Sequence, residues 1–522
     1  LIRRRSSLRK AHAMIPLEWM PPLMFGGLVI FMLIGFPVAF SLMAAGLFFS
    51  VIAMSEGFFG IAFLQAIPQR IFGSVLANDL LLAIPFFTFM GAILERCGLA
   101  EEMLDSMGQL FGRVRGGLGY SVIIVGFILG AITGTVAAQV IAMAMISLPV
   151  MMRYGYNMRY ATGVLAASGT ITQLVPPSLV LIVLADQLKT QSGSADVGSM
   201  YLGAWGPSIL QIALFALYTF FLSRIRPDYL PPVPESDLTL KGWALWKKCL
   251  MGIIPSAVLI FLVLGTIMTG IATPTESGAM GAMGALLLAW LRRASIPNLS
   301  KLIKQSYQNT MRITAMVVFI LIGSTCFSVV FQGVDGGRWV EELFSNLPGG
   351  WIGFLILVNL FVFLLAFFLD FFEIAFIVVP MLAPVAVKLL SPVLLESMNG
   401  NPQAAASAAL VWFGVMLCVN MQTSFMHPPF GFALFYLRGV APKEVKSSDI
   451  YWGALPWVAL QLVMVVLVMA FPAMVTTFLD KPAVVVQSQD FNFTGTDENK
   501  LDQINKVDED APVTFQLDKP AK

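Results

Sequence analysis

The chain has 522 residues, of which 57% are hydrophobic and 12% are charged. Soluble domains carry a charge on about a quarter of their residues, so this composition excludes a soluble globular protein and predicts an all-α polytopic membrane protein in contact with the lipid bilayer. The net charge of +2 comes with no basic domain and no interleaving of basic and aromatic residues, so nucleic-acid binding is not expected.

Apolar segments long enough to cross a bilayer follow one another along the chain. The first, 21–54, follows a basic N-terminal segment, 1–20, and is one kinked helix or two, because Gly-Phe-Pro at 35–37 interrupts it. A polar tail, 479–522, has too few apolar residues to form a core and is expected to be disordered. The other predicted spans are 80–95, 117–152, 160–188, 201–222, 250–271, 275–291, 311–331, 351–390, 408–437 and 451–478.

Lys and Arg orient these segments, because short basic loops stay in the cytoplasm. The predicted cytoplasmic clusters are 113–117, 151–160, 223–248, 291–305 and 436–446. The predicted outer loops, which hold few Lys or Arg, are 187–200, 332–350 and 391–407. Segment 117–152 therefore has cytoplasmic loops at both ends, and segment 351–390 has outer loops at both ends. Each is predicted to be a re-entrant helical hairpin, and the two enter from opposite faces.

Adjacent prolines interrupt the span that follows each hairpin, at Pro176–Pro177 in 160–188 and at Pro428–Pro429 in 408–437. A proline removes a helical hydrogen bond, and freed backbone groups at membrane depth are tolerated only within protein or beside water. The alternative is that each proline pair only kinks a packed helix. Two breaks in matching places instead predict an inverted-topology repeat with discontinuous helices, in two halves, 21–248 and 249–478.

Several segments resemble the large membrane subunit of tripartite ATP-independent periplasmic (TRAP) transporters. The "TPTE" turn together with the paired "PPS" and "PPFG" motifs is specific, and the resemblance covers roughly residues 21 to 478. His427 stands where the family usually has Thr. The matching segments are AIPFFTFMGAILERCGL (83–99), GTVAAQVIAM to MMRYGY (134–156), ASGTITQLVPPS (167–178), GIATPTESGAMGAMGALLLA (270–289), FFLDFFEIAFIVVPMLAPV (367–385) and HPPFGFALFYLRGVAP (427–442).

The resemblance implies a sodium-driven, elevator-type importer of a small carboxylate, such as a C4-dicarboxylate or a sugar acid, in the bacterial inner membrane. Its partners would be a small four-helix membrane subunit and a periplasmic solute-binding protein. No cofactor is implied beyond sodium as the coupling ion, and neither a P-loop nor a His-Glu-x-x-His motif points to an enzyme. The alternatives are a stand-alone sodium- or proton-coupled anion carrier, namely a dicarboxylate symporter or an ion antiporter, and a membrane scaffold without transport.

Unwound helix segments free carbonyl groups for a hard cation, and half-helix N-termini attract a carboxylate. We expect sodium alone, and no transition metal. The candidate ion ligands are Thr133, Gly134, Thr135, Gly169, Thr170 and Thr172 in the first half, and Asp370, Asn420, Thr423 and Ser424 in the second. The candidate substrate-binding residues are Pro176, Pro177, Ser178, Pro428, Pro429 and Phe430.

Four polar residues have competing interpretations. Asp370 lies inside an apolar hairpin, where a carboxylate is costly and by default functional; the alternative is that it caps the hairpin tip. Glu276 is expected to form a capping box with Thr273 rather than bind an ion. Asp186 is expected to be solvated. His427 is a hydrogen-bonded packing residue or, alternatively, a proton-sensitive one.

Overall fold

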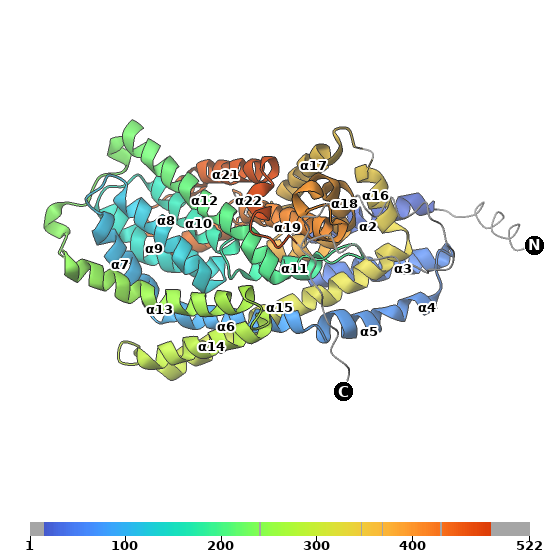
Figure 1. The fold of residues 1–522 in the computed structure, drawn as a ribbon, viewed down its shortest axis with the longest axis horizontal. Coiled ribbons are helices and arrows are strands. Elements are labelled where there is room, and N and C mark those ends of the chain that lie inside the picture. The colour runs from blue at the N-terminus through green and yellow to red at the C-terminus, as the bar shows by residue number, and fades with distance from the viewer. Residues whose placement is uncertain (1–14, 240–241, 346, 368, 429–430, 482–522) are drawn as a thin grey trace, which may run out of the picture. The chain divides into compact units, whose positions relative to one another are not determined.

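The computed structural model describes residues 15–481 apart from 240–241, 346, 368 and 429–430 (Figure 1). The predicted tail beyond residue 481 and the first fourteen residues of the predicted basic segment lie outside this part. Within it, regular structure is helical except for one isolated bridge between Lys189 and Ser194. Eight of the described helices are long and apolar enough to cross a membrane, or nine if a bent pair counts as one span.

The first half begins with two helices, which is the second of the two alternatives expected for 21–54, because the chain turns at Gly35, whose φ is +97°. The helices of this half are α2 Met20–Leu33, α3 Val38–Ser55, α4 Ile61–Leu64, α5 Ala66–Arg70, α6 Ala83–Arg96, α7 Leu99–Phe111, α8 Gly117–Thr133, α9 Val136–Arg153, α10 Met158–Thr170, α11 Leu179–Gln187 and α12 Val197–Ile225.

The second half repeats this order of elements. Its helices are α13 Trp243–Met268, α14 Pro274–Leu291, α15 Leu299–Gly333, α16 Gly336–Ser345, α17 Gly350–Leu365, α18 Phe371–Leu394, α19 Pro402–Met421, α20 Phe432–Val440, α21 Ser447–Ala470 and α22 Ala473–Thr476. The expected division at 248 falls inside α13. The expected outer loop 332–350 contains α16, a short helix whose exposed charged face hides it from an apolar-span search.

Both predicted hairpins are present as pairs of packed helices, α8 with α9 and α17 with α18. The 17 residues of α8 extend about 25 Å, which is shorter than the roughly 30 Å hydrocarbon core. The open end of the first hairpin is closed by the Tyr156 hydroxyl, which accepts a hydrogen bond from the Leu118 N–H at 3.3 Å. The chain therefore enters and leaves at one end, as a re-entrant hairpin must.

The loop before α13 holds the open end of the first hairpin in place. Asp237 accepts hydrogen bonds from the Tyr154 hydroxyl at 2.9 Å and from Arg153 at 3.2 Å. The hydrogen bond from Tyr154, with smaller contributions from Ser236 and Arg153, lowers the pKa of the Asp237 carboxyl. The open end of the hairpin is thus held in place, and at its tip Gly134 adopts a left-handed conformation.

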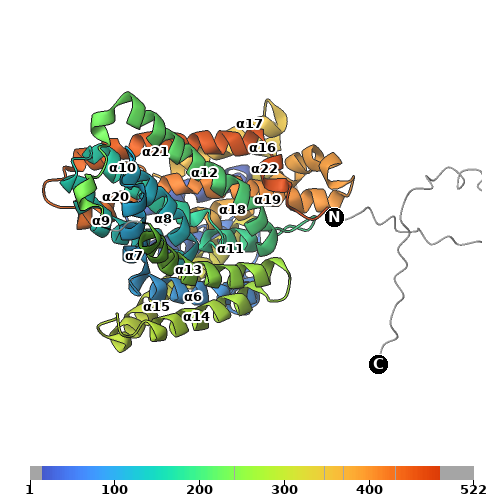
Figure 2. The ribbon, with the colours of Figure 1, turned by 60° about the vertical axis from the view of Figure 1, so that its left-hand side comes forward.

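Long helices of each half pack against long helices of the other half (Figure 1). Helix α3 of the first half packs along α15 of the second, and α14 of the second half packs along α6 of the first. Figure 2 shows α6, α13 and α14 on one side of the described unit. The broken helices also pack across the two halves: α11 contacts the hairpin arm α18, and α20 contacts the hairpin arm α9. This reciprocal packing is the inverted-topology repeat expected from the sequence.

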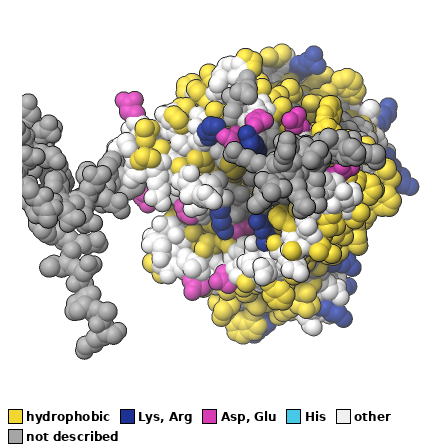
Figure 3. Space-filling model, turned by 90° about the vertical axis from the view of Figure 1, so that its right-hand side faces the viewer, with side chains coloured by type: hydrophobic (Ala, Val, Ile, Leu, Met, Phe, Trp, Pro, Cys, Tyr) yellow, Lys and Arg dark blue, Asp and Glu magenta, His cyan; other side chains and the backbone are white. Residues whose placement is uncertain are grey.

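Many large hydrophobic side chains are exposed on the long helices, and hydrophobic side chains cover much of the face drawn in Figure 3. On α13, for example, Val258 is 60% exposed and Phe261 is 80% exposed. Such surfaces are unfavourable in water and match the hydrocarbon of a bilayer. The half-helices α10 and α19, which lead into the two breaks, are in contrast buried inside the protein, where freed backbone groups find partners.

Candidate functional site

The first helix break lies between α10 and α11. A short 3-10 turn, Ile171–Gln173, ends α10, and the chain then passes through buried Pro176 and Pro177. Ser178 begins the second half-helix: its hydroxyl accepts a hydrogen bond from the Val180 N–H at 3.1 Å and donates to the Gln173 carbonyl. The predicted half-helix N-terminus at Ser178 is therefore present. Since proline has no N–H, Pro176 and Pro177 shape this break but donate nothing to a ligand.

The break is fastened to its own hairpin. The Thr172 hydroxyl donates to the Gly130 carbonyl of α8 at 2.8 Å, and a Cβ on Gly130 would lie 3.1 Å from the Thr172 Cα. Gln139 of α9 donates to the Gly126 carbonyl at 2.6 Å and to the Ser168 carbonyl at 3.0 Å. These contacts require glycine on α8, and they place the break along the hairpin as the sequence predicted.

The six predicted first-half ligands have different surroundings in the structure. Gly134 adopts a left-handed conformation (φ +63°) at the hairpin tip, where it and Thr135 are half-buried. The Thr133 side chain lies outside the described part. Gly169 is required for packing, because a Cβ there would lie 2.2 Å from Val140. Its backbone carbonyl is the only ligand it can offer.

Thr170 is already committed to other partners. Its hydroxyl donates to the Ala167 carbonyl at 2.8 Å and accepts from the Gln461 amide at 2.9 Å. A hydroxyl that both donates and accepts in this way has less capacity left for a cation. Thr170 is therefore the weakest of the predicted ligands, and Gln461 is a partner that the sequence did not reveal.

The second break, between α19 and α20, has the same construction. Asn420 donates to the backbone carbonyl of Asn359 at 2.8 Å and to its side-chain oxygen at 2.9 Å, which fastens α19 to the hairpin arm α17. The hydroxyls of Thr423 and Ser424 donate to the Asn420 and Met421 carbonyls, each at 2.7 Å. Their hydrogens are thus used locally, and their oxygens can face a cation.

The proline pair of this break is only partly described. Pro428 is half-buried, whereas Pro429 and Phe430 lie outside the described part. Helix α20 begins at Phe432 with Gly431 as its N-cap residue. His427 is 2% exposed and stacks on Phe367, with ring centroids 4.1 Å apart. Its packing role is confirmed. Neither ring nitrogen has a hydrogen-bond partner of normal geometry, and the ring interacts with the backbone of Ala366.

Asp370 starts α18 at the tip of the second hairpin. Its carboxylate accepts a hydrogen bond from the Glu373 N–H at 3.1 Å, and the Glu373 carboxylate accepts from the Asp370 N–H at 3.0 Å. This capping box satisfies two N–H groups that the helix leaves open. Capping of the tip by Asp370 is therefore confirmed, and ion binding by the same carboxylate stays a prediction.

Gln211 and Gln461, two glutamines that the sequence analysis missed, connect the halves at the breaks. Gln211 of α12 and Gln422 of the second break exchange amide hydrogen bonds at 2.7 and 3.2 Å, and both are fully buried. Gln461 of α21 donates a single hydrogen bond, at 2.9 Å, to the Thr170 hydroxyl of the first break. Each glutamine comes from the span that closes the opposite half, so the two contacts are related by the repeat.

Buried polar atoms without partners gather at the breaks. Both amide atoms of Gln173 lack a hydrogen bond, as do the Ser168 hydroxyl and the side-chain carbonyl oxygens of Asn420 and Gln461. In most proteins buried polar groups are paired, and exceptions often face an ion or water. These atoms are free to act as oxygen ligands for a cation and, at Gln173, as an N–H donor for an anion; such binding stays a prediction.

Two further expectations are settled nearby. Glu276 forms the predicted capping box with Thr273, whose N–H donates to it at 2.8 Å. The expectation that Asp186 is solvated is wrong: it is 8% exposed and accepts hydrogen bonds from Asn78 at 2.8 Å and Lys189 at 2.7 Å. Asn78 lies before α6, so this contact ties the end of α11 to the long helices that pack across the two halves.

Two hairpins, two broken helices at matching positions and a buried polar site between them define a membrane transporter built from an inverted repeat. The family model described as "Tripartite ATP-independent periplasmic transporter, DctM component" matches residues 25–474, and the chain belongs to this family. The family consists of transport proteins, so the prediction that the chain is not an enzyme is confirmed.

Curated relatives cover nearly the whole chain. It is 26% identical to the C4-dicarboxylate TRAP transporter large permease protein DctM of Rhodobacter capsulatus, over 86% of this chain and 97% of that protein. It is 24% identical to the sialic acid TRAP transporter large permease protein SiaM of Vibrio cholerae, over 84% and 93%. The YdaH transporter of Alcanivorax borkumensis shares its fold, with a TM-score of 0.52 and 16% identity over 79% of this chain and 89% of that one.

Proposed function

We propose that the chain is the large permease subunit of a sodium-coupled importer of small organic acids in the bacterial inner membrane. Its partners are a small four-helix membrane subunit and a periplasmic solute-binding protein that delivers the cargo. The cargo is a small carboxylate such as a C4-dicarboxylate or a sugar acid. The relatives named for C4-dicarboxylates and for sialic acid, both carboxylates, support this class of cargo.

The observation that carries the proposal is the gathering of unpaired buried polar atoms at the two helix breaks. Oxygen atoms of Asn420, Thr423 and Ser424 lie together in the second break. Asn420 contacts the second hairpin, whose arm α18 begins at Asp370. Sodium is a hard cation that takes such oxygen ligands, together with carbonyls freed where a helix unwinds. This region supports a sodium site.

The cargo carboxylate is assigned to the half-helix N-termini. The positive ends of helix dipoles at Ser178 and Gly431 attract an anion, and the unpaired amide of Gln173 can donate to it. The hairpins and broken helices would carry this site across the membrane in an elevator movement against the long helices α3, α6, α14 and α15. The packing of α3 on α15 and of α14 on α6 supports the proposal that these four helices form a scaffold against which the rest moves.

The dependence on partners tests this function against a stand-alone carrier. The chain is reconstituted in liposomes with its small subunit and its binding protein, and uptake of labelled succinate and sialic acid is measured under an inward sodium gradient. Omitting the binding protein is expected to lower the initial rate at least tenfold, because the cargo is delivered by that protein. Full uptake by the chain alone would support the stand-alone carrier and overturn the tripartite proposal.

A further inference from the structure

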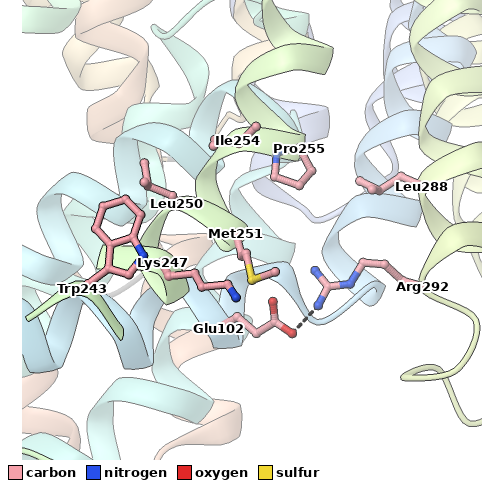
Figure 4. A pocket seen from close by; sticks show the side chains of 9 residues that line it. All are labelled: Glu102, Trp243, Lys247, Leu250, Met251, Ile254, Pro255, Leu288 and Arg292. Carbon is pink, nitrogen blue, oxygen red and sulfur yellow. Dashed lines mark hydrogen bonds and ion pairs between the residues drawn. The ribbon is translucent and has the colours of Figure 1, made fainter. Parts of the chain in front are cut away.

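A pocket of about 610 Å³ lies where α7, α13 and α14 meet, away from the helix breaks (Figure 4). One wall is the apolar face of α13, on which Trp243 is 75%, Met251 62% and Ile254 51% exposed. The same face continues as a second hollow from Ile254 to Ile271. The 26 residues of α13 extend about 39 Å, so this wall runs through the hydrocarbon core.

Cationic side chains stand at one end of the pocket. Lys247 and Arg292 extend toward Glu102 from two sides in Figure 4, and Arg292 forms an ion pair with that carboxylate. Lys247 is exposed and has no ion pair within the described part of the chain. The pocket lining thus has two cations and one carboxylate, which leaves one positive charge.

The sequence places this end at the cytoplasmic surface. Lys247 belongs to the basic cluster 223–248 and Arg292 to the basic cluster 291–305, and short basic loops stay inside. The ring of Trp243 lies at the same end, which is where aromatic side chains mark the interface between hydrocarbon and headgroups. Positive charge at the interface above a long apolar wall is the chemistry of an anionic phospholipid site.

We propose that this groove binds a monoanionic glycerophospholipid such as phosphatidylglycerol. The phosphate lies between Lys247 and Arg292, and the acyl chains lie along the exposed face of α13 from Met251 toward Ile271. The charge complementarity favours a lipid over a wholly apolar partner helix, because such a helix would cover Lys247 and bring no anion to pair with it. The inference does not depend on which solute the protein carries.

Native mass spectrometry of the delipidated full-length protein, titrated with phosphatidylglycerol or phosphatidylcholine, tests the proposal. One phosphatidylglycerol is expected to bind about fivefold more tightly than phosphatidylcholine, since one interfacial cation changes affinity by about that factor. Lys247→Gln is expected to remove this preference and Lys247→Arg to keep it. Lys301→Gln, on an exposed lysine at the start of α15 in the same basic cluster as Arg292, is the matched control and should bind like the wild type.

Four results would overturn the lipid site. The first is equal affinity for the two lipids in the wild type, and the second is wild-type preference in Lys247→Gln. The third is loss of the bound lipid when the small membrane subunit is added, which would show that the groove is a protein interface. Full displacement of the lipid by millimolar glycerol 1-phosphate would likewise reduce the site to a phosphate-binding surface and overturn the role of the apolar wall.

Discussion

Asp370→Asn is expected to weaken the apparent sodium affinity of transport by about thirtyfold while leaving the fold intact. Asparagine caps a helix as well as aspartate does, so the hydrogen bond to the Glu373 N–H survives and only the charge is lost. A carboxylate and a cation 4 Å apart attract by about 4 kcal/mol at an effective dielectric constant of 20. If desolvation offsets about half of that attraction, about 2 kcal/mol remains, which corresponds to about thirtyfold in affinity.

The measurement is the sodium concentration that gives half-maximal uptake in the reconstituted complete transporter. Glu276→Gln is the matched control, because it exchanges a carboxylate for an amide in the other capping box, at the start of α14. That variant should keep the wild-type sodium dependence. If Asp370→Asn also kept it, Asp370 would be a helix cap alone and the ion site would have to be placed elsewhere.

Gln211→Leu is expected to lower the free energy of unfolding by about 1–3 kcal/mol and to slow uptake at least tenfold. The substitution leaves the buried Gln422 amide without a partner, and an unpaired buried amide has a cost of that size. Because Gln422 lies in the 3-10 turn of the second break, its relaxation displaces the neighbouring Thr423 and Ser424. Thermal unfolding of the purified protein and initial uptake rates are the two readouts.

A double-mutant cycle separates this contact from general disruption. Gln211→Leu combined with Gln422→Leu should be less destabilising than the sum of the two single substitutions, because neither amide is then left unpaired. Additive losses would show that the two side chains contribute independently. Gln461→Leu, at the contact related by the repeat, is expected to affect the first break through Thr170 in the same direction.

Features that depend on local sequence were predictable. The proline pairs gave the two breaks because proline cannot continue a helix, and the charge of the flanking loops gave the hairpins. The capping box of Thr273 and Glu276 was recognised from residues three apart. The short helices α7 and α16 were missed, since their charged faces keep them below the hydrophobicity of a span.

Features that depend on distant contacts were not predictable. Gln211 and Gln422 are 211 positions apart, and nothing in the sequence near either residue points to the other. Asp186 looked like a solvated residue at the end of a span, yet Asn78, 108 positions away, is one of the groups that bind it. Likewise, the close packing of Val140 against Gly169 depends on a distant contact and was not predictable, while ion binding by the Gly169 carbonyl stays a prediction.

The most direct test of the account is the initial rate of carboxylate uptake by the complete reconstituted transporter, with either a sodium gradient or an equal potassium gradient. The proposed site at the helix breaks requires uptake that saturates with sodium and falls to the background of protein-free liposomes when potassium replaces it. An equal rate in potassium, or a rate set by the pH gradient alone, would contradict sodium coupling at this site.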